Sequence, residues 1–202
     1  MKVNYFDLGV YKGVEADWMV SNIFPMLGIS DYRVYCFEAC KAYATRLSRL
    51  YSNNDKVTVI NKAVVDKPGM VNLYYSPNMV GHSVFATKKN VISKYEEVEG
   101  IVFSDWLKEN VKDYETSFNI LKVNIEGAEW YLFNDLVKTG INKHIDVFCG
   151  QGHDVEKVGE LSDKIEQYYS LLKENNIHLY RFTEHKPHQN DDLYKILKEK
   201  GL

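Results

Sequence analysis

Cysteine is scarce in this chain: only three of its 202 residues are cysteines, and three cannot all pair within one molecule. Cys36, Cys40 and Cys149 also lack the C-x-x-C pairs, or the nearby histidines at ligand spacing, that a zinc site requires. Cys36 lies in an apolar run that predicts a buried strand, where cysteine packs as a small hydrophobic side chain. We therefore expect three reduced, structural cysteines and no metal site formed by them.

Long hydrophobic runs and an excess of charge of one sign are also absent. No apolar stretch approaches the ~20 residues that span a bilayer, and the first residues lack the basic and then apolar layout of a signal peptide. The formal net charge is −3, which gives no reason to expect nucleic acid or an anionic membrane as a partner. These absences predict a cytoplasmic protein without nucleic-acid or membrane partners, and they leave the oligomeric state open.

Short apolar runs alternate with longer helical patterns along the whole chain, which predicts a single domain over residues 1–202. The expected strands are 3–6, 33–37, 56–60, 70–76, 100–103, 118–125, 145–149 and 177–182. The expected helices are 13–27, 41–51, one that begins at an N-cap Ser104, 129–138, 155–173 and 191–200. Continuous apolar strands between amphipathic helices indicate an α/β fold with a doubly wound, mostly parallel sheet and helices on both faces.

Polar residues gather directly after the expected strands. In a doubly wound sheet, ligands bind beyond the carboxyl ends of the strands, near the point where the strand order reverses. The segments at those ends are Asp7 to Gly13, Glu38, Asn61 to Asp66, Asn124 to Glu129 and Gly150 to His153. Their position favours a binding site built from these segments.

Two glycines follow the first expected strand in the pattern Asp7-x-Gly9-x-x-x-Gly13. Glycine lets the backbone turn sharply and lets a ligand approach it closely, although an ordinary strand–helix turn would use the same residues. The third glycine of the G-x-G-x-x-G fingerprint is missing, which disfavours an NAD-dependent oxidoreductase. Glu38, after the second strand, either accepts both hydroxyls of a ribose or is a surface glutamate that begins the next helix.

Five stretches of the chain occur in an order and spacing that point to a known family. They are "YFDLGVYKG" (5–13), "VYCFEACKAY" (34–43), "INKAVVDKPGMVNLYYS" (60–76), "GHSVF" (81–85) and "ILKVNIEGAEWYLF" (120–133). Over residues 3 to about 137 the chain resembles the FkbM-type S-adenosylmethionine-dependent methyltransferases. The resemblance implies a seven-stranded Rossmann-like sheet, S-adenosyl-L-methionine as cofactor, and O-methylation of a hydroxyl on a sugar, polyketide or similar small molecule.

The resemblance also implies roles for individual residues. It assigns the following residues to the cofactor: Asp7, Leu8, Gly9, Tyr11, Gly13, Glu38, Ala63 and Asn124. Asp7 would face the amine of the methionine end, Glu38 the ribose, and Ala63 the adenine. His82 and Ser83 would lie near the substrate.

Transfer of a methyl group to a hydroxyl requires close alignment and a group that takes the proton. His153 is the preferred base, because it follows a core strand and histidine changes charge near neutral pH; it could equally cap the next helix. Glu126 and Glu129 are the next catalytic candidates, although Glu129 could simply begin its helix. His185 and His188 resemble a metal-binding pair only superficially, so we expect no metal.

Some residues depart from the family pattern. Asn124 stands where the family usually has an aspartate, "GQGH" (150–153) lacks an acid that often precedes the histidine, and the chain starts almost at the first strand. These departures support an alternative, a catalytically weakened methyltransferase-like domain that binds S-adenosylmethionine or serves as an interaction module.

Overall fold

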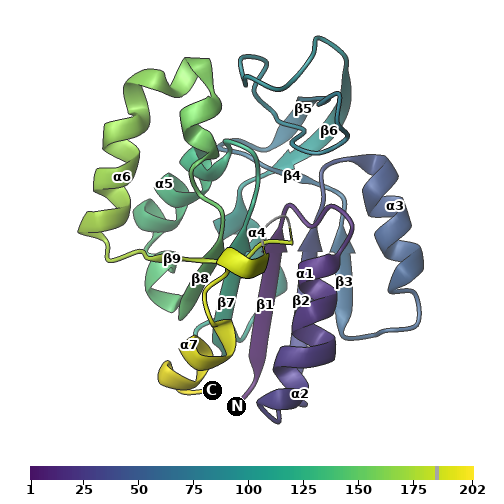
Figure 1. The fold of residues 1–202 in the computed structure, drawn as a ribbon, viewed down its shortest axis with the longest axis vertical. Coiled ribbons are helices and arrows are strands. Elements are labelled where there is room, and N and C mark those ends of the chain that lie inside the picture. Colours follow the sequence, from purple (N-terminus) through teal and green to yellow (C-terminus); the bar gives the residue numbers. More distant parts are fainter. Residues whose placement is uncertain (185–186) are drawn as a thin grey trace.

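A six-stranded parallel sheet forms the centre of the protein (Figure 1). The computed structural model describes residues 1–184 and 187–202. The strand order is β3-β2-β1-β7-β8-β9, and every neighbouring pair is parallel. The strands are β1 (Val3–Leu8), β2 (Tyr32–Phe37), β3 (Val57–Ile60), β7 (Phe118–Val123), β8 (Val147–Gly150) and β9 (Leu179–Arg181). This is the order of a Rossmann-like, doubly wound sheet, which reverses between β1 and β7.

Helices cover both faces of this sheet, as the composition of its strands predicts. One face carries α1 (Val14–Trp18), the π-helical segment η1 (Met19–Ile23), α2 (Phe24–Met26), α3 (Lys41–Leu50) and α7 (Leu193–Glu199). The other carries α4 (Phe103–Asn110), α5 (Glu129–Thr139) and α6 (Ile165–Glu174). In β1, Tyr5 packs into the first face while Phe6 and Leu8 pack into the second. Strands buried on both sides are therefore continuously apolar.

A second, three-stranded sheet lies beyond the carboxyl ends of the central strands (Figure 1). It contains β4 (Ala63–Val64), β5 (Gly69–Tyr74) and β6 (Tyr95–Ile101), and β5 pairs with β6 in the antiparallel sense. The expectation of a seven-stranded sheet is therefore wrong, since the strands expected at 70–76 and 100–103 belong to this smaller sheet. β6 alternates between exposed and buried residues over most of its length, which is typical of an antiparallel strand with one wet face.

Two expected helices also differ from the structure. Val102 is the N-cap of α4, while Ser104 lies inside the first turn and its hydroxyl donates to Asp135 Oδ1 at 2.6 Å. The helix expected over 155–173 is divided into the 3₁₀ segments η3 (Asp154–Lys157) and η4 (Gly159–Lys164), and then α6. Val158 is extended and forms an isolated bridge to Lys88. A tertiary contact thus interrupts a region whose apolar spacing is helical.

The remaining short elements lie outside the central layers. They are the 3₁₀ turns η2 (Ile141–His144) and η5 (Pro187–Gln189). None of the helices in the described part of the chain has the length and apolar character needed to cross a membrane. Cys36, Cys40 and Cys149 are free and buried, as their sequence context predicts.

Candidate active site

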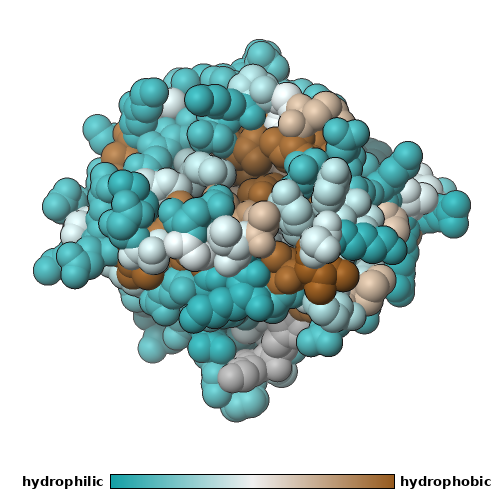
Figure 2. Space-filling view, turned by 90° about the horizontal axis from the view of Figure 1, so that it is seen from above, coloured by the Kyte–Doolittle hydropathy of each residue, from teal (hydrophilic) through white to brown (hydrophobic). Residues whose placement is uncertain are grey.

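A cleft opens at the carboxyl ends of β1, β2 and β7, where the strand order reverses. Figure 2 looks onto this end of the sheet and shows hydrophobic side chains gathered in a hollow within a hydrophilic surround. The cleft holds about 800 Å³ of non-protein space, including open solvent at its mouth, and small-molecule sites typically occupy ~300–1,000 Å³. Six of the predicted cofactor and substrate residues line it: Gly9, Tyr11, Glu38, Ala63, His82 and Asn124.

The turn after β1 forms one wall of the cleft. Gly9 has φ +82°, and a Cβ atom at this position would lie 1.9 Å from the carbonyl oxygen of Asn124. Only glycine therefore allows β1 and β7 to continue side by side into the cleft. Gly13 does not line the cleft: it precedes α1 with φ +89°, and a Cβ there would lie 2.9 Å from Leu47. Its role is the close packing of α1 against α3.

Glu38 joins the first turn to the start of α3. Its two carboxylate oxygens accept hydrogen bonds from the backbone N–H groups of Tyr11 and Cys40, each at 2.8 Å. The side chain lines the cleft although only 8% of the residue is exposed. Burial raises the pKa of Glu38 to about 7, while the two backbone donors act in the opposite direction. Glu38 is thus a buried carboxylate of the cleft wall rather than an ordinary surface glutamate.

Asp7 lies below the cleft instead of lining it. Its Oδ1 is 2.8 Å from Nζ of Lys122, and both side chains are fully or almost fully buried. Lys122 Nζ also donates to the carbonyl oxygen of Gly9 at 2.9 Å. The pair therefore supports the Gly9 turn, and a ligand amine would not meet Asp7. Leu8 points into the apolar core beside α4 and α5 and likewise does not line the cleft.

The Asp7–Lys122 ion pair has opposite effects on its two members. Burial raises the pKa of Asp7, and Lys122 opposes this effect. Burial by itself would lower the pKa of Lys122, but Asp7 raises it above its ordinary value. Sequence reasoning missed Lys122, although a lysine inside the apolar run 118–123 is a visible signal. Asp7 and Lys122 occupy paired positions in the parallel register of β1 and β7.

Glu15 supplies the acidic group that the first turn presents to the cleft. It lies in the first turn of α1, lines the cleft, and is 6% exposed. Its Oε1 accepts a hydrogen bond from the backbone N–H of Glu184 at 3.0 Å. A cationic amine bound beside Gly9 would therefore meet Glu15. The sequence pattern had favoured Asp7 for this contact.

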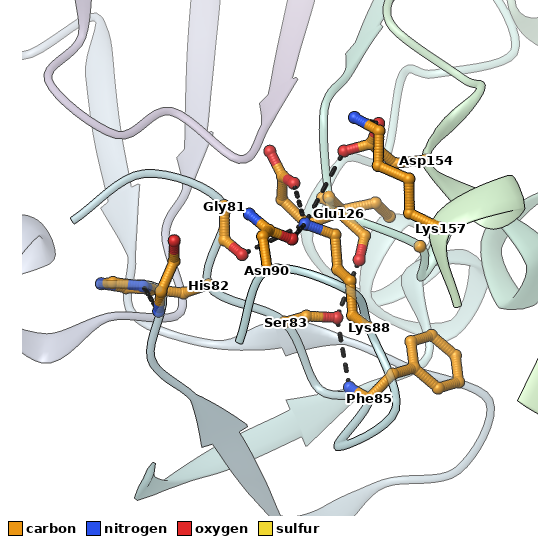
Figure 3. A network of polar contacts seen from close by, with 12 residues as sticks. Gly81, His82, Ser83, Phe85, Lys88, Asn90, Glu126, Asp154 and Lys157 are labelled. Carbon is orange, nitrogen blue, oxygen red and sulfur yellow. Dashed lines mark hydrogen bonds and ion pairs between the residues drawn. The ribbon is translucent and has the colours of Figure 1, made fainter. Parts of the chain in front are cut away.

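Glu126 lies at the mouth of β7 in the centre of a charged network (Figure 3). Its backbone has φ +59°, and its Oε2 is 2.6 Å from Nζ of Lys88. The buried Lys88 also donates to Asn90 Oδ1 at 2.6 Å and to the Gly81 carbonyl at 3.2 Å. Its Nζ lies 3.9 Å from Asp154. The long connection between β5 and β6 is thereby fastened to the loop after β7.

The protonation of Glu126 is shifted by this network. Burial raises its pKa to about 8, with a further contribution from the hydrogen bond to Asp154 and its charge, while Lys88 lowers it. Asp154 behaves in the opposite way: burial would raise its pKa, but hydrogen bonds to Glu126 and Lys157 lower it below the ordinary value. Lys157 Nζ is 2.5 Å from Asp154 Oδ1. Glu126 is therefore a carboxyl group of the cleft whose pKa is raised well above its ordinary value by burial.

His82 and Ser83 have different positions although they are adjacent. His82 lines the cleft, its ring is stacked on Tyr43, and its Nδ1 accepts a hydrogen bond from the backbone N–H of Ser76 at 2.9 Å. The neutral ring therefore carries its hydrogen on Nε2 and acts there as a donor. Ser83 is buried behind the cleft, where its hydroxyl donates to the carbonyl oxygen of Glu126 at 2.7 Å. Ser83 positions Glu126 rather than lining the site.

The structure places His153 and Glu129 outside the cleft. His153 follows β8, but it lines a separate pocket with Arg181, and about half of its side chain is exposed. Glu129 is fully buried, and its two oxygens accept the backbone N–H groups of Ile125 at 2.9 Å and Gly127 at 2.6 Å. Burial raises the pKa of Glu129 to about 7. Glu129, the first residue of α5, thus binds back to backbone amides of the loop that connects β7 to α5.

No metal centre was expected, and His185, one of the two histidines considered for one, lies outside the described residues. Within 1–184 and 187–202, no three His, Cys, Asp or Glu side chains converge as a metal site would require.

The fold is that of a Rossmann-like α/β protein, with a cleft of the size typical of small-molecule sites at the point where the strand order reverses. No protein-family model matches the chain, and no curated protein or solved structure gives a significant match.

Proposed function

We propose that this protein is an S-adenosylmethionine-dependent methyltransferase that methylates a hydroxyl group of a sugar, polyketide or similar small molecule. The observation that carries the proposal is Glu38, a buried carboxylate in the cleft wall at the end of β2, beside the Gly9 turn. An acid at this position of a doubly wound sheet is suited to the two hydroxyls of a ribose. The resemblance of the sequence to FkbM-type methyltransferases supports the same assignment.

In this proposal the cleft residues divide into three groups along the adenosyl amino acid. Gly9 and Glu15 face its amino-acid end, where Glu15 matches the charge of the amine. Glu38 accepts the ribose hydroxyls. Ala63 and Leu73 supply an apolar wall for the adenine. Asn124 lines the cleft between the amino-acid end and the ribose. Its backbone carbonyl packs directly against the Cα of Gly9.

S-Adenosylmethionine supplies an electrophilic methyl group on a sulfonium centre, so the protein must align the acceptor hydroxyl and remove its proton. Glu126 takes the proton in this proposal, because it lines the cleft and its pKa of about 8 lies close to neutral pH. His82 donates from Nε2 and orients the hydroxyl oxygen. When a bound S-adenosylmethionine supplies the methyl group, the Glu126 carboxylate would accept the proton that the hydroxyl loses. Lys88 stabilises the charged form of that carboxylate between turnovers.

A second candidate is a domain that binds the same cofactor without transferring its methyl group. The observation in its favour is the 2.6 Å contact between Lys88 and Glu126, which occupies one oxygen of the proposed base. The two candidates differ in one measurement. Methyl transfer to added small-molecule alcohols, followed by release of S-adenosylhomocysteine, supports the enzyme, whereas tight cofactor binding without turnover over a broad acceptor panel favours the binding domain.

Cofactor binding is tested with S-adenosylhomocysteine and thermal unfolding. A ligand present at 100 times its dissociation constant stabilises the folded state by ~2.7 kcal/mol. We expect this stabilisation for the unmodified chain, and at least a tenfold weaker affinity for Glu38→Gln. Glu109→Gln is the matched control, because Glu109 is an exposed acid at the end of α4. No stabilisation at millimolar ligand, or an unchanged affinity in Glu38→Gln, would contradict the proposal.

A further inference from the structure

A second pocket lies beyond the carboxyl end of β8 and alongside β9 and α6, on the side of β8 away from the cleft. It holds about 730 Å³ of non-protein space, including open solvent. Its polar lining includes Gln151 and His153 from the loop after β8, and His178 and Arg181 from the segment that contains β9. The pocket thus brings one fixed positive charge and two imidazoles to one concavity, and none of its lining residues is acidic.

Arg181 is the distinctive residue of this pocket. Its backbone N–H donates to Asp191 at the edge of the sheet, which fixes the residue, but its guanidinium forms no ion pair with any described carboxylate. The Nε atom is buried and has no hydrogen-bond acceptor within the described residues. A buried donor without an acceptor is unfavourable, so the guanidinium is suited to an acceptor that enters the pocket.

The acids around the pocket are already engaged. Asp154 lies 3.6 Å from Nε2 of His153, but its closer contacts are with Lys157 at 2.5 Å and with the network of Lys88. Glu156 accepts a hydrogen bond from the hydroxyl of Tyr169, another lining residue. His153 and His178 both line the pocket, and the ring of His178 contacts that of Tyr180 edge-on, with the ring centroids 4.5 Å apart. Together with a guanidinium fork the two imidazoles suit the oxygens of a phosphate or carboxylate.

We propose that this pocket binds the oxyanion group of a small molecule, with Arg181 as its principal ligand and His153 and His178 as supporting donors. The loop after β8 is fastened to the end of β7, because the backbone N–H of Gln151, a lining residue of this pocket, donates to the carbonyl oxygen of Val123 at 2.8 Å. Asn124, the next residue after Val123, lines the cleft.

The inference is tested by recording histidine ring signals by NMR while inorganic phosphate is added at constant pH and ionic strength. We expect the signals of His153 and His178 to move together with a single dissociation constant. The signal of His144, which precedes β8 at the opposite end of the sheet, should not follow them. A parallel titration with acetate distinguishes a site for phosphate from one for carboxylates, and either response supports the inference.

Two variants make the test specific. Arg181→Gln removes the charge from an edge strand without removing a core side chain, and it should weaken binding at least tenfold. Arg46→Gln, on the exposed side of α3, should leave it unchanged. Unmoved His153 and His178 signals with both anions, or equal affinity in Arg181→Gln, would overturn the inference. Binding of S-adenosylhomocysteine is measured separately, so its loss would reject the proposed function while leaving the oxyanion site standing.

Discussion

Asp7 and Lys122 form a buried ion pair directly below the cleft, and their removal tests whether they support the Gly9 turn. Lys122→Met leaves the Asp7 carboxylate buried without its cation, which typically costs ~3–5 kcal/mol. We expect the free energy of unfolding in urea to fall by about this amount. In the double variant Asp7→Asn and Lys122→Met, most of the loss should be recovered, since no unpaired charge remains.

The double variant also separates support from ligand binding. If Asp7 contacted the cofactor amine, its replacement would weaken S-adenosylhomocysteine binding even in a stable protein. Glu15 lines the cleft and Asp7 does not, so we expect the double variant to bind within a few-fold of the unmodified chain. A loss of tenfold or more would restore Asp7 as a ligand-binding residue.

At the residue scale, the sequence correctly predicted the position of residues that directly follow a strand of the central sheet. Gly9, Glu38 and Asn124 follow three apolar runs, and the parallel sheet brings them to one cleft. Lys88 escaped this reasoning, because its partner Glu126 is 38 residues away in the sequence. His153 also follows a strand, but the direction in which a loop side chain points depends on packing that the sequence does not express.

At the scale of elements, the connection between β5 and β6 is held over the cleft by Lys88. Lys88 lowers the pKa of Glu126, so its replacement by Met should raise that pKa above about 8. The titration is followed through the carboxyl carbon of Glu126 by ¹³C NMR, which requires no substrate. Lys89→Met is the matched control, because the neighbouring lysine is exposed. A titration midpoint that stays in place in Lys88→Met would show that the ion pair does not control Glu126.

The order of elements was largely predictable, whereas the sheet to which each strand belongs was not. Apolar runs correctly predicted β1, β2, β3, β7, β8 and β9. β6 is exposed at alternate positions over most of its length, and this period of two marks it as a strand of a separate antiparallel sheet. The region 155–173 has helical spacing throughout, but the bridge between Val158 and Lys88 divides it. Pairing between distant segments decided both outcomes.

At the scale of the whole molecule, buried carboxyl groups should make stability depend on pH. Burial raises the pKa of Glu38 and Glu129 to about 7, and that of Glu126 to about 8. Each group binds its proton more tightly when folded than when unfolded, so the native state holds more protons from about pH 5 to 8. Stability therefore falls as the pH rises through this range. Burial lowers the pKa of His82, so this residue alone would make stability rise with pH below about pH 6.5. The opposite contributions of the three glutamates outweigh it.

We expect the free energy of unfolding to decrease by roughly 2 kcal/mol or more between pH 5.5 and 8, because one unit of pKa shift corresponds to ~1.4 kcal/mol. Urea unfolding at fixed ionic strength measures the slope. Glu129→Gln should reduce it, since the amide cannot lose a proton in either state, while Glu109→Gln should not change it. A stability that rises steadily from pH 5.5 to 8 would mean that these carboxyl groups are ionised in the folded protein, and it would remove Glu126 as a base that exchanges its proton near neutral pH.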